Sequence, residues 1–164
     1  MAGYEKAFGI DHAETLRVVS NMATVFAEQG QYKKALVLYE RALAGYEKAF
    51  GVDHPDTLRV VSNMASVFGN QGQYEKALDL YQRVLSGYEK ALGVGHPDTL
   101  TTIYIMAFIF DKQGQHGKAR EWYERALAGS KQALRVDHPR TQHTVRGLAK
   151  VHERTGQTEH AQSL

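Results

Sequence analysis

The chain has 164 residues, of which 43% are hydrophobic and 23% charged, a composition typical of a globular protein. Twenty basic against eighteen acidic side chains give a formal charge of +2 without long runs of either sign, so we expect no nucleic-acid partner and no membrane partner. The absence of cysteine excludes disulfides, thiolate zinc sites and cysteine nucleophiles. No apolar run reaches the about 18 residues of a membrane span, and no signal-peptide pattern opens the chain, so we expect a soluble, cytoplasmic protein.

The sequence repeats with a period of 42 residues. Residues 1–10 match the end of a broken repeat, residues 11–52, 53–94 and 95–136 are full repeats, and residues 137–164 form a partial repeat. The first two full copies share 31 identities over 42 positions, and the third shares 20 with the second. Because stacked repeats bury one continuous core, we expect a single repeat domain over residues 1–164.

Each repeat is predicted to contain two helices, because its apolar residues recur at steps of three and four. In the second copy these residues are Leu58, Val61, Met64, Ala65 and Phe68, followed by Tyr74, Ala77, Leu78, Tyr81, Val84, Leu85 and Tyr88. Gly72 lies between the two sets and can adopt the left-handed conformation that ends a helix. Its counterparts Gly30, Gly114 and Gly156 are expected to do the same.

The stretch GYEKALGVGHPDTL, residues 87–100, is predicted to join one repeat to the next. Gly93 would end a second helix and Pro97 would begin the following first helix. In the preceding copy, Asp53, His54 or Thr57 could accept hydrogen bonds from the free amides at the helix start. Gly45, Gly87 and Gly129 fall inside second helices, where glycine is unfavourable, so we expect a kink or a close helix approach there.

The pattern resembles the tetratricopeptide repeat, and the resemblance covers essentially the whole chain. The small and large residues of that family appear in each full copy as Met22, Ala23, Phe26, Ala35, Tyr39 and Ala42, as Met64, Ala65, Phe68, Ala77, Tyr81 and Val84, and as Met106, Ala107, Phe110, Ala119, Tyr123 and Ala126. The 42-residue period, longer than the usual about 34, looks like the kinesin light chain subclass and the C-terminal repeat arrays of fungal nucleotide-binding, NLR-like proteins. The resemblance implies an all-α, right-handed superhelical solenoid.

No enzyme, cofactor or metal site is expected. His12, His54, His96 and His138 recur once per repeat, but equivalent positions of stacked helices lie about 8–10 Å or more apart, too far to share one metal ion. We interpret them as residues that make contacts at helix starts. Neither a G-x-x-x-x-G-K-[ST] nor a G-x-G-x-x-G motif is present.

One face of the first helices is the candidate binding surface. The resemblance implies that it lines a concave groove, with Asn21 and Asn63 near the asparagines that bond peptide backbone in the family. Arg17 and Arg59 have no acidic residue four places later, so we expect them to be unpaired, and aromatic residues in the third copy predict an apolar pocket. The candidate groove residues are Arg17, Ser20, Asn21, Thr24, Arg59, Ser62, Asn63, Ser66, Thr101, Tyr104, Phe108, Arg146 and Lys150.

The predicted function is therefore a non-catalytic scaffold that binds a protein or peptide in this groove. The alternative is a sensing or self-association segment of a larger NLR-like ATPase, or of a kinesin light chain-like cargo adaptor. The apolar residues of the broken N-terminal repeat, Tyr4, Ala7 and Phe8, also predict weak end-to-end self-association, because the ends of solenoids usually need polar caps.

Overall fold

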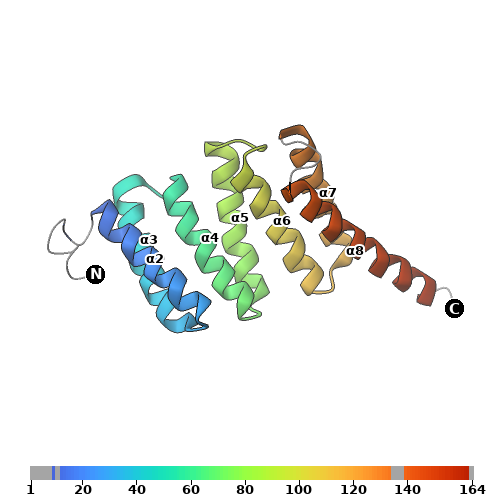
Figure 1. The fold of residues 1–164 in the computed structure, drawn as a ribbon, viewed down its shortest axis with the longest axis horizontal. Coiled ribbons are helices and arrows are strands. Elements are labelled where there is room, and N and C mark those ends of the chain that lie inside the picture. The colour runs from blue at the N-terminus through green and yellow to red at the C-terminus, as the bar shows by residue number, and fades with distance from the viewer. Residues whose placement is uncertain (1–8, 10–11, 134–138, 163–164) are drawn as a thin grey trace. The chain divides into compact units, whose positions relative to one another are not determined.

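The computed structural model describes residues 9, 12–133 and 139–162, and all regular secondary structure in these ranges is helical (Figure 1). The helices are α2 (Ala13–Glu28), α3 (Tyr32–Phe50), α4 (Pro55–Asn70), α5 (Tyr74–Ala91), α6 (Pro97–Lys112), α7 (His116–Ala133) and α8 (Pro139–Gln162). The predicted all-α class is thus confirmed. Contacts divide the chain into two compact units, Met1–Gly87 and Tyr88–Leu164, with the division inside α5.

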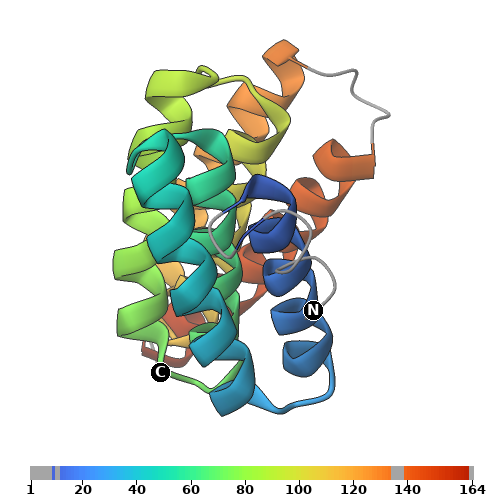
Figure 2. The same ribbon diagram turned by 90° about the vertical axis from the view of Figure 1, so that its left-hand side faces the viewer.

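In the first unit, α2 and α3 lie side by side as a hairpin, and α4 packs against both (Figures 1 and 2). Apolar residues from the facing stripes of these three helices form the core, which is completed at its edges by residues such as Phe26 and Leu80. Its buried members are Leu16, Val19, Ala23, Ala35, Tyr39, Ala42, Tyr46, Val60, Met64 and Val67. The helical spacing of the sequence therefore places its apolar positions on one interior face.

In the second unit, α6 and α7 form the equivalent hairpin, and α8 packs mainly against α7. One core cluster consists of Ala107, Ala119, Tyr123 and Val151, with Tyr104, Phe110, Trp122 and Leu148 partly buried around it. The ring of Phe110 lies 6.0 Å from that of Trp122. Since α8 supplies Val151, which is fully buried, the partial last repeat completes this core with its first helix alone.

The turn inside each hairpin follows the predicted glycine pattern at three of four positions. Gly30, Gly72 and Gly114 have φ of +72°, +73° and +73°, and the residue after each donates its amide to a carbonyl of the helix that has just ended. The same prediction for Gly156 is wrong, because α8 runs through it. A continued helix satisfies the backbone N–H and C=O groups on both sides of Gly156 without a turn.

The joint between repeats is held by a threonine and a histidine. The Oγ1 of Thr57 donates to the carbonyl of Gly51, whose φ is +93°, at 2.8 Å, and His54 Nδ1 accepts the amide of Asp56 at 3.2 Å. The same bonds recur at 42-residue intervals, from Thr15 to Gly9 and Thr99 to Gly93, with His12 and His96 as the caps. The interpretation of these three histidines as helix-start residues is confirmed; His138 lies outside the described residues.

The glycines inside the second helices mark close helix approaches. A Cβ on Gly45 would lie 2.4 and 2.6 Å from the two methyl groups of Leu16, which is 1% exposed. A Cβ added to Gly87 would lie 2.4 Å from a methyl group of Leu58, and one added to Gly129 would lie 2.4 Å from a methyl group of Leu100. Each first helix thus presses a leucine directly onto the backbone of its partner helix.

We expect Gly45→Ala to destabilise the protein although alanine is the better helix former. Alanine gains about 1 kcal/mol of helix propensity, but overpacking a filled core costs about 1–3 kcal/mol, and Leu16 has no exposed space to move into. Urea denaturation measures the difference. Gly156→Ala is the control: it is also inside a helix, nothing lies within 4 Å of its Cβ, and it should stabilise. Equal stabilisation by both changes would contradict the close approach.

Candidate functional site

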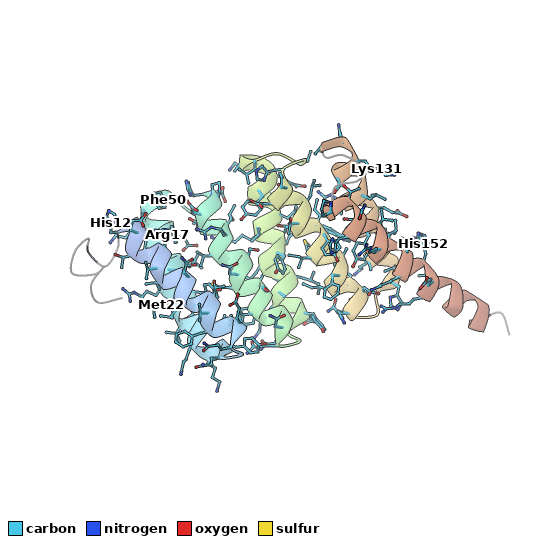
Figure 3. The ribbon with its side chains drawn as sticks, viewed as in Figure 1. His12, Arg17, Met22, Phe50, Lys131 and His152 are labelled. Atoms are coloured by element: carbon cyan, nitrogen blue, oxygen red, sulfur yellow. The ribbon has the colours of Figure 1, made fainter. Side chains whose placement is uncertain are left out.

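The predicted groove residues all lie on first helices. In the first unit they occupy α2 and α4, and in the second unit α6 and α8. Figure 3 labels Arg17, one turn after His12 at the start of α2. Most of these side chains are exposed or half-exposed, as a binding face requires. Ser20 is the exception: it is 1% exposed, and its hydroxyl has no hydrogen-bond partner among the described residues. Assigning Ser20 to an open face was wrong, because α2 turns it toward the core.

The prediction that Arg17 and Arg59 are unpaired is also wrong. The Nε of Arg17 donates to Glu14 at 3.1 Å, and the guanidinium of Arg59 donates to Asp56 at 3.1 Å. The acidic partner stands three residues earlier, on the same helix face, whereas the prediction rested on the position four residues later. These arginines therefore contribute little net positive charge to the face.

The structure brings the two arginines together around Tyr46, a residue that the groove prediction did not include. Tyr46 on α3 is 3% exposed, and its hydroxyl shares a hydrogen bond with Arg59 and lies within the electrostatic reach of Arg17. Burial raises the pKa of the Tyr46 hydroxyl, and the nearby Arg59 opposes part of that rise. A buried tyrosine of α3 therefore interacts with the arginines of both α2 and α4.

Asn21 and Asn63 offer unused hydrogen-bonding groups. Asn21 is exposed and Asn63 half-exposed, and neither carboxamide has a hydrogen-bond partner among the described residues. A carboxamide both donates and accepts, which matches the N–H and C=O of an extended peptide. Ser62, immediately before Asn63 on α4, is half-exposed as well. The face of the first unit is therefore polar and open for contact.

Thr24 and Ser66 bond to the buried tyrosines beneath them. The hydroxyls of Thr24 and Tyr39 are 2.8 Å apart, and Ser66 shares a side-chain hydrogen bond with Tyr81. Desolvation raises the pKa of Tyr81 to about 12, against a smaller lowering by Ser66. Burial likewise raises the pKa of Tyr39. These two predicted groove positions therefore also bond to the buried core.

In the second unit the same positions carry aromatic rings. Phe108 stands where Thr24 and Ser66 stand in earlier repeats; it is 44% exposed, with the ammonium of Lys112 5.2 Å from its ring. Tyr104 packs edge-on against Tyr123 at 5.5 Å. Burial, with added effects of Tyr104 and Asp111, raises the pKa of Tyr123. The third repeat thus replaces hydroxyl contacts with an apolar, partly exposed surface.

Beside these rings, a cavity of about 180 Å³ opens in the second unit, lined by Leu100, Thr101, Tyr104, Ser130, His143 and Thr144. Its wall is mostly apolar, as the aromatic residues of the third copy predicted. Ser130 was missed, although the repeat alignment holds the signal: it takes the place of Tyr46 and Tyr88. Thr101 and Tyr104 are the predicted residues that the cavity unites, whereas Arg146, Lys150 and Phe108 do not line it.

On α8, Arg146 and Lys150 are exposed and have no ion-pair partner among the described residues. A neighbouring arginine is used differently: Arg154 binds both carboxylate oxygens of Asp111, at 2.7 and 2.6 Å, and His116 lies 3.0 Å from the same carboxylate. This cluster fixes α8 against the α6–α7 hairpin. Arg154 is therefore engaged in holding α8, unlike Arg146 and Lys150.

The second helices carry ion pairs that the sequence analysis also missed. Arg83 donates to Glu47 at 2.6 Å and to the carbonyl of Val52 at 3.3 Å, joining α5 to α3 within the first unit. Arg125 and Glu89 make the corresponding pair in the second unit. The signal was an arginine 36 residues after a glutamate, recurring with the 42-residue period.

Within the described part of the chain, no three His, Asp or Glu side chains come together as a metal site would require. No helix there is both long enough and apolar enough to cross a membrane.

Comparisons with known proteins agree with the repeat architecture. A sequence model described as a tetratricopeptide repeat matches residues 1–48, 14–90, 56–132 and 98–164. A crystal structure of nearly identical TPR-like repeats from Podospora anserina, described as a kinesin light chain, is 26% identical with a TM-score of 0.78 over 99% of this chain and 77% of that one. The comparison with curated proteins gave no match.

More distant structures show the same fold. BtubC (BKLC) from P. vanneervenii is 18% identical, with a TM-score of 0.79 over 91% of this chain and 59% of that one. The Sgt2 TPR domain from Aspergillus fumigatus is also 18% identical, with a TM-score of 0.63 over 91% of this chain and 83% of that one.

The buried tyrosines predict a loss of stability at alkaline pH. Because the folded-state pKa of Tyr81 is about 12 against an ordinary value of 10.0, its contribution is complete below pH 10 and is lost as pH rises toward about 12. A rise of this size corresponds to about 2–3 kcal/mol at most. Urea denaturation followed by circular dichroism across this range measures it. Tyr81→Phe should show a shallower decline, and an identical decline in both proteins would contradict the assignment.

Proposed function

Because this chain belongs to the tetratricopeptide repeat family, whose members generally act as protein–protein interaction scaffolds, we propose that it is a non-catalytic scaffold binding an extended protein or peptide segment along the face of its first helices. In the family's arrangement this face lines a groove. The repeats supply a preformed surface, so that binding does not have to order the receptor.

The observation that carries the proposal is the pair of partnerless carboxamides of Asn21 and Asn63. They stand one repeat apart on neighbouring helices of one unit, and each can bond a peptide group of a ligand. Other candidate residues add side-chain selectivity. Phe108 offers an exposed ring, and Arg146 and Lys150 offer cations that attract carboxylates. A segment with both aromatic and acidic residues fits this chemistry.

The test begins with peptides selected on the protein from a random displayed library, whose affinities are then measured by fluorescence anisotropy. We expect Asn63→Ala to weaken binding several-fold, since a hydrogen bond contributes about 0.5–1.5 kcal/mol. Phe108→Ala should weaken it about tenfold or more, because an exposed aromatic ring is a typical anchor of an interface. Melting temperatures should change little, because both side chains project from the face.

Matched controls lie on the second helices. Gln82→Ala removes an exposed carboxamide from α5 and is the control for Asn63→Ala. Arg120→Glu reverses an exposed charge on α7 and is the control for Lys150→Glu on α8, which should weaken the binding of an acidic peptide. Both controls should bind as the parent protein does. If the control changes abolish binding while the first-helix changes do not, the ligand uses the second helices and the proposal is wrong.

A second candidate, self-association, is favoured by the first repeat. Val25 on α2 is 51% exposed, whereas its repeat equivalents Val67 and Val151 are 1% and 0% exposed. Val37 on α3, also 64% exposed, lines a shallow hollow of about 410 Å³ with Phe26, Lys33, Lys34 and Leu38. In later repeats the residues equivalent to Val25 are buried against a neighbouring hairpin. In the first repeat, a second copy of the chain could bury Val25 instead.

We expect Val25→Lys to shift the protein toward monomer in sedimentation-velocity experiments at high protein concentration. Val145→Lys is the matched control, because Val145 is similarly exposed, at 46%, on α8 of the other unit. A parent protein that stays monomeric at every concentration would contradict self-association, and so would an equal effect of both substitutions.

A further inference from the structure

The cavity of the second unit lies where earlier repeats hold a tyrosine. Ser130 on α7 stands at the position that Tyr46 and Tyr88 occupy in the two preceding repeats. All three side chains are buried: Ser130 is 2% exposed, Tyr46 3% and Tyr88 6%. Lys131, labelled in Figure 3, marks this end of α7. The exchange of tyrosine for serine removes an aromatic ring from a buried position.

The framework around the position is preserved. In the first repeat, Leu16 presses on Gly45 immediately before Tyr46, and in the third repeat Leu100 presses on Gly129 immediately before Ser130, at the same 2.4 Å. Arg17 and Arg59 both interact with Tyr46. The residues at the same positions two repeats later are Thr101 and His143, and both line the cavity. The walls of a tyrosine slot are therefore present without its tyrosine.

The size of the cavity fits one ring. Its volume is about 180 Å³, and an apolar protein cavity of about 150 Å³ binds benzene. The lining is mostly apolar and includes Leu100 and Tyr104, residue types that pack well against an aromatic guest. An aromatic ring can thus enter at little cost in polar desolvation.

The polar groups of the lining favour a hydroxyl donor. His143 Nδ1 lies 2.8 Å from the carbonyl of Pro139, which can only accept, so Nδ1 is the donor of that bond. An imidazole that donates from Nδ1 can accept a hydrogen bond only at Nε2. The hydroxyl of Thr101 donates to the carbonyl of Pro97 at 2.7 Å, which leaves its lone pairs to accept. Both groups complement a phenol better than a plain phenyl ring.

We propose that this cavity is a specificity pocket for a tyrosine side chain of the bound peptide, with the phenol ring in the space vacated at Ser130 and its hydroxyl donating to His143 or Thr101. The inference rests on the proposed peptide-binding function and adds the residue type that the second unit selects. Serine at position 130, where the earlier repeats have tyrosine, leaves a space with the dimensions of a tyrosine ring.

The experiment titrates the full chain with N-acetyl-tyrosinamide, N-acetyl-phenylalaninamide and p-cresol, followed by ¹H–¹⁵N NMR. We expect the tyrosine derivative to shift the amides of Ser130, His143 and Thr144 and to bind at least threefold more tightly than the phenylalanine derivative. His143→Phe, which keeps a ring but removes the acceptor, should bring that ratio close to one. No binding of either aromatic amide would overturn the proposal.

Ser130→Tyr is the decisive variant, because it refills the slot as in the first two repeats. It should weaken the tyrosine derivative at least tenfold while the melting temperature stays the same or rises. Ala128→Tyr, which adds the same ring at an exposed position of α7, should bind as the parent does. Unchanged binding by Ser130→Tyr, or equal loss in both variants, would overturn the assignment.

Two further comparisons identify the source of the ring and separate this proposal from the one on which it rests. If p-cresol binds at least tenfold more tightly than N-acetyl-tyrosinamide, the cavity is a small-molecule site and the assignment to a peptide is wrong. Asn63→Ala should leave N-acetyl-tyrosinamide binding unchanged. If selected peptides are weakened by Asn63→Ala but bind the Ser130→Tyr variant as well as the parent, the pocket assignment alone is contradicted. If N-acetyl-tyrosinamide binds but no peptide does, the peptide-binding function is contradicted.

Discussion

The contact of a leucine with a helical glycine is the constraint on which each hairpin depends. Leu16 on Gly45, Leu58 on Gly87 and Leu100 on Gly129 bring the backbones of paired helices closer than any side chain would allow. The residue after each glycine is consequently held in a buried position beside the first helices. Whether that residue is tyrosine or serine then decides whether the position is filled or open.

The sequence was sufficient for most of the fold because the relevant signals are local. Positive φ at Gly72, the proline at the start of α4 and the apolar stripes each follow from one residue's stereochemistry or from helical period. Gly156 shows the limit of this reasoning. It occupies the position of the other turn glycines, yet α8 continues through it, so a repeated glycine does not by itself end a helix.

The candidate site was less predictable, since it depends on neighbours that are close in space. The ion pairs of Arg17 and Arg59 with Glu14 and Asp56 were within reach of the sequence, since they join residues three apart on one helix. The interaction of both arginines with Tyr46 was not, because Tyr46 lies on another helix. The burial of Ser20 follows from how α2 is rotated against its neighbours, which a stripe of small polar residues does not specify. Asn21 and Asn63 remain predictions as ligand contacts.

Repetition explains how a binding feature can arise in this scaffold without a new fold. The joints, with Thr57 bonded to Gly51 and Thr99 to Gly93, recur almost unchanged, so single substitutions act within a fixed frame. Exchanging a buried tyrosine for Ser130 would ordinarily leave a destabilising void, because interiors are close-packed. Such a void is better tolerated if it opens to a surface and a ligand ring can occupy it. The third repeat combines that opening with exposed Phe108, so in the proposed peptide complex these two departures from the repeat are what would give the face its chemical selectivity.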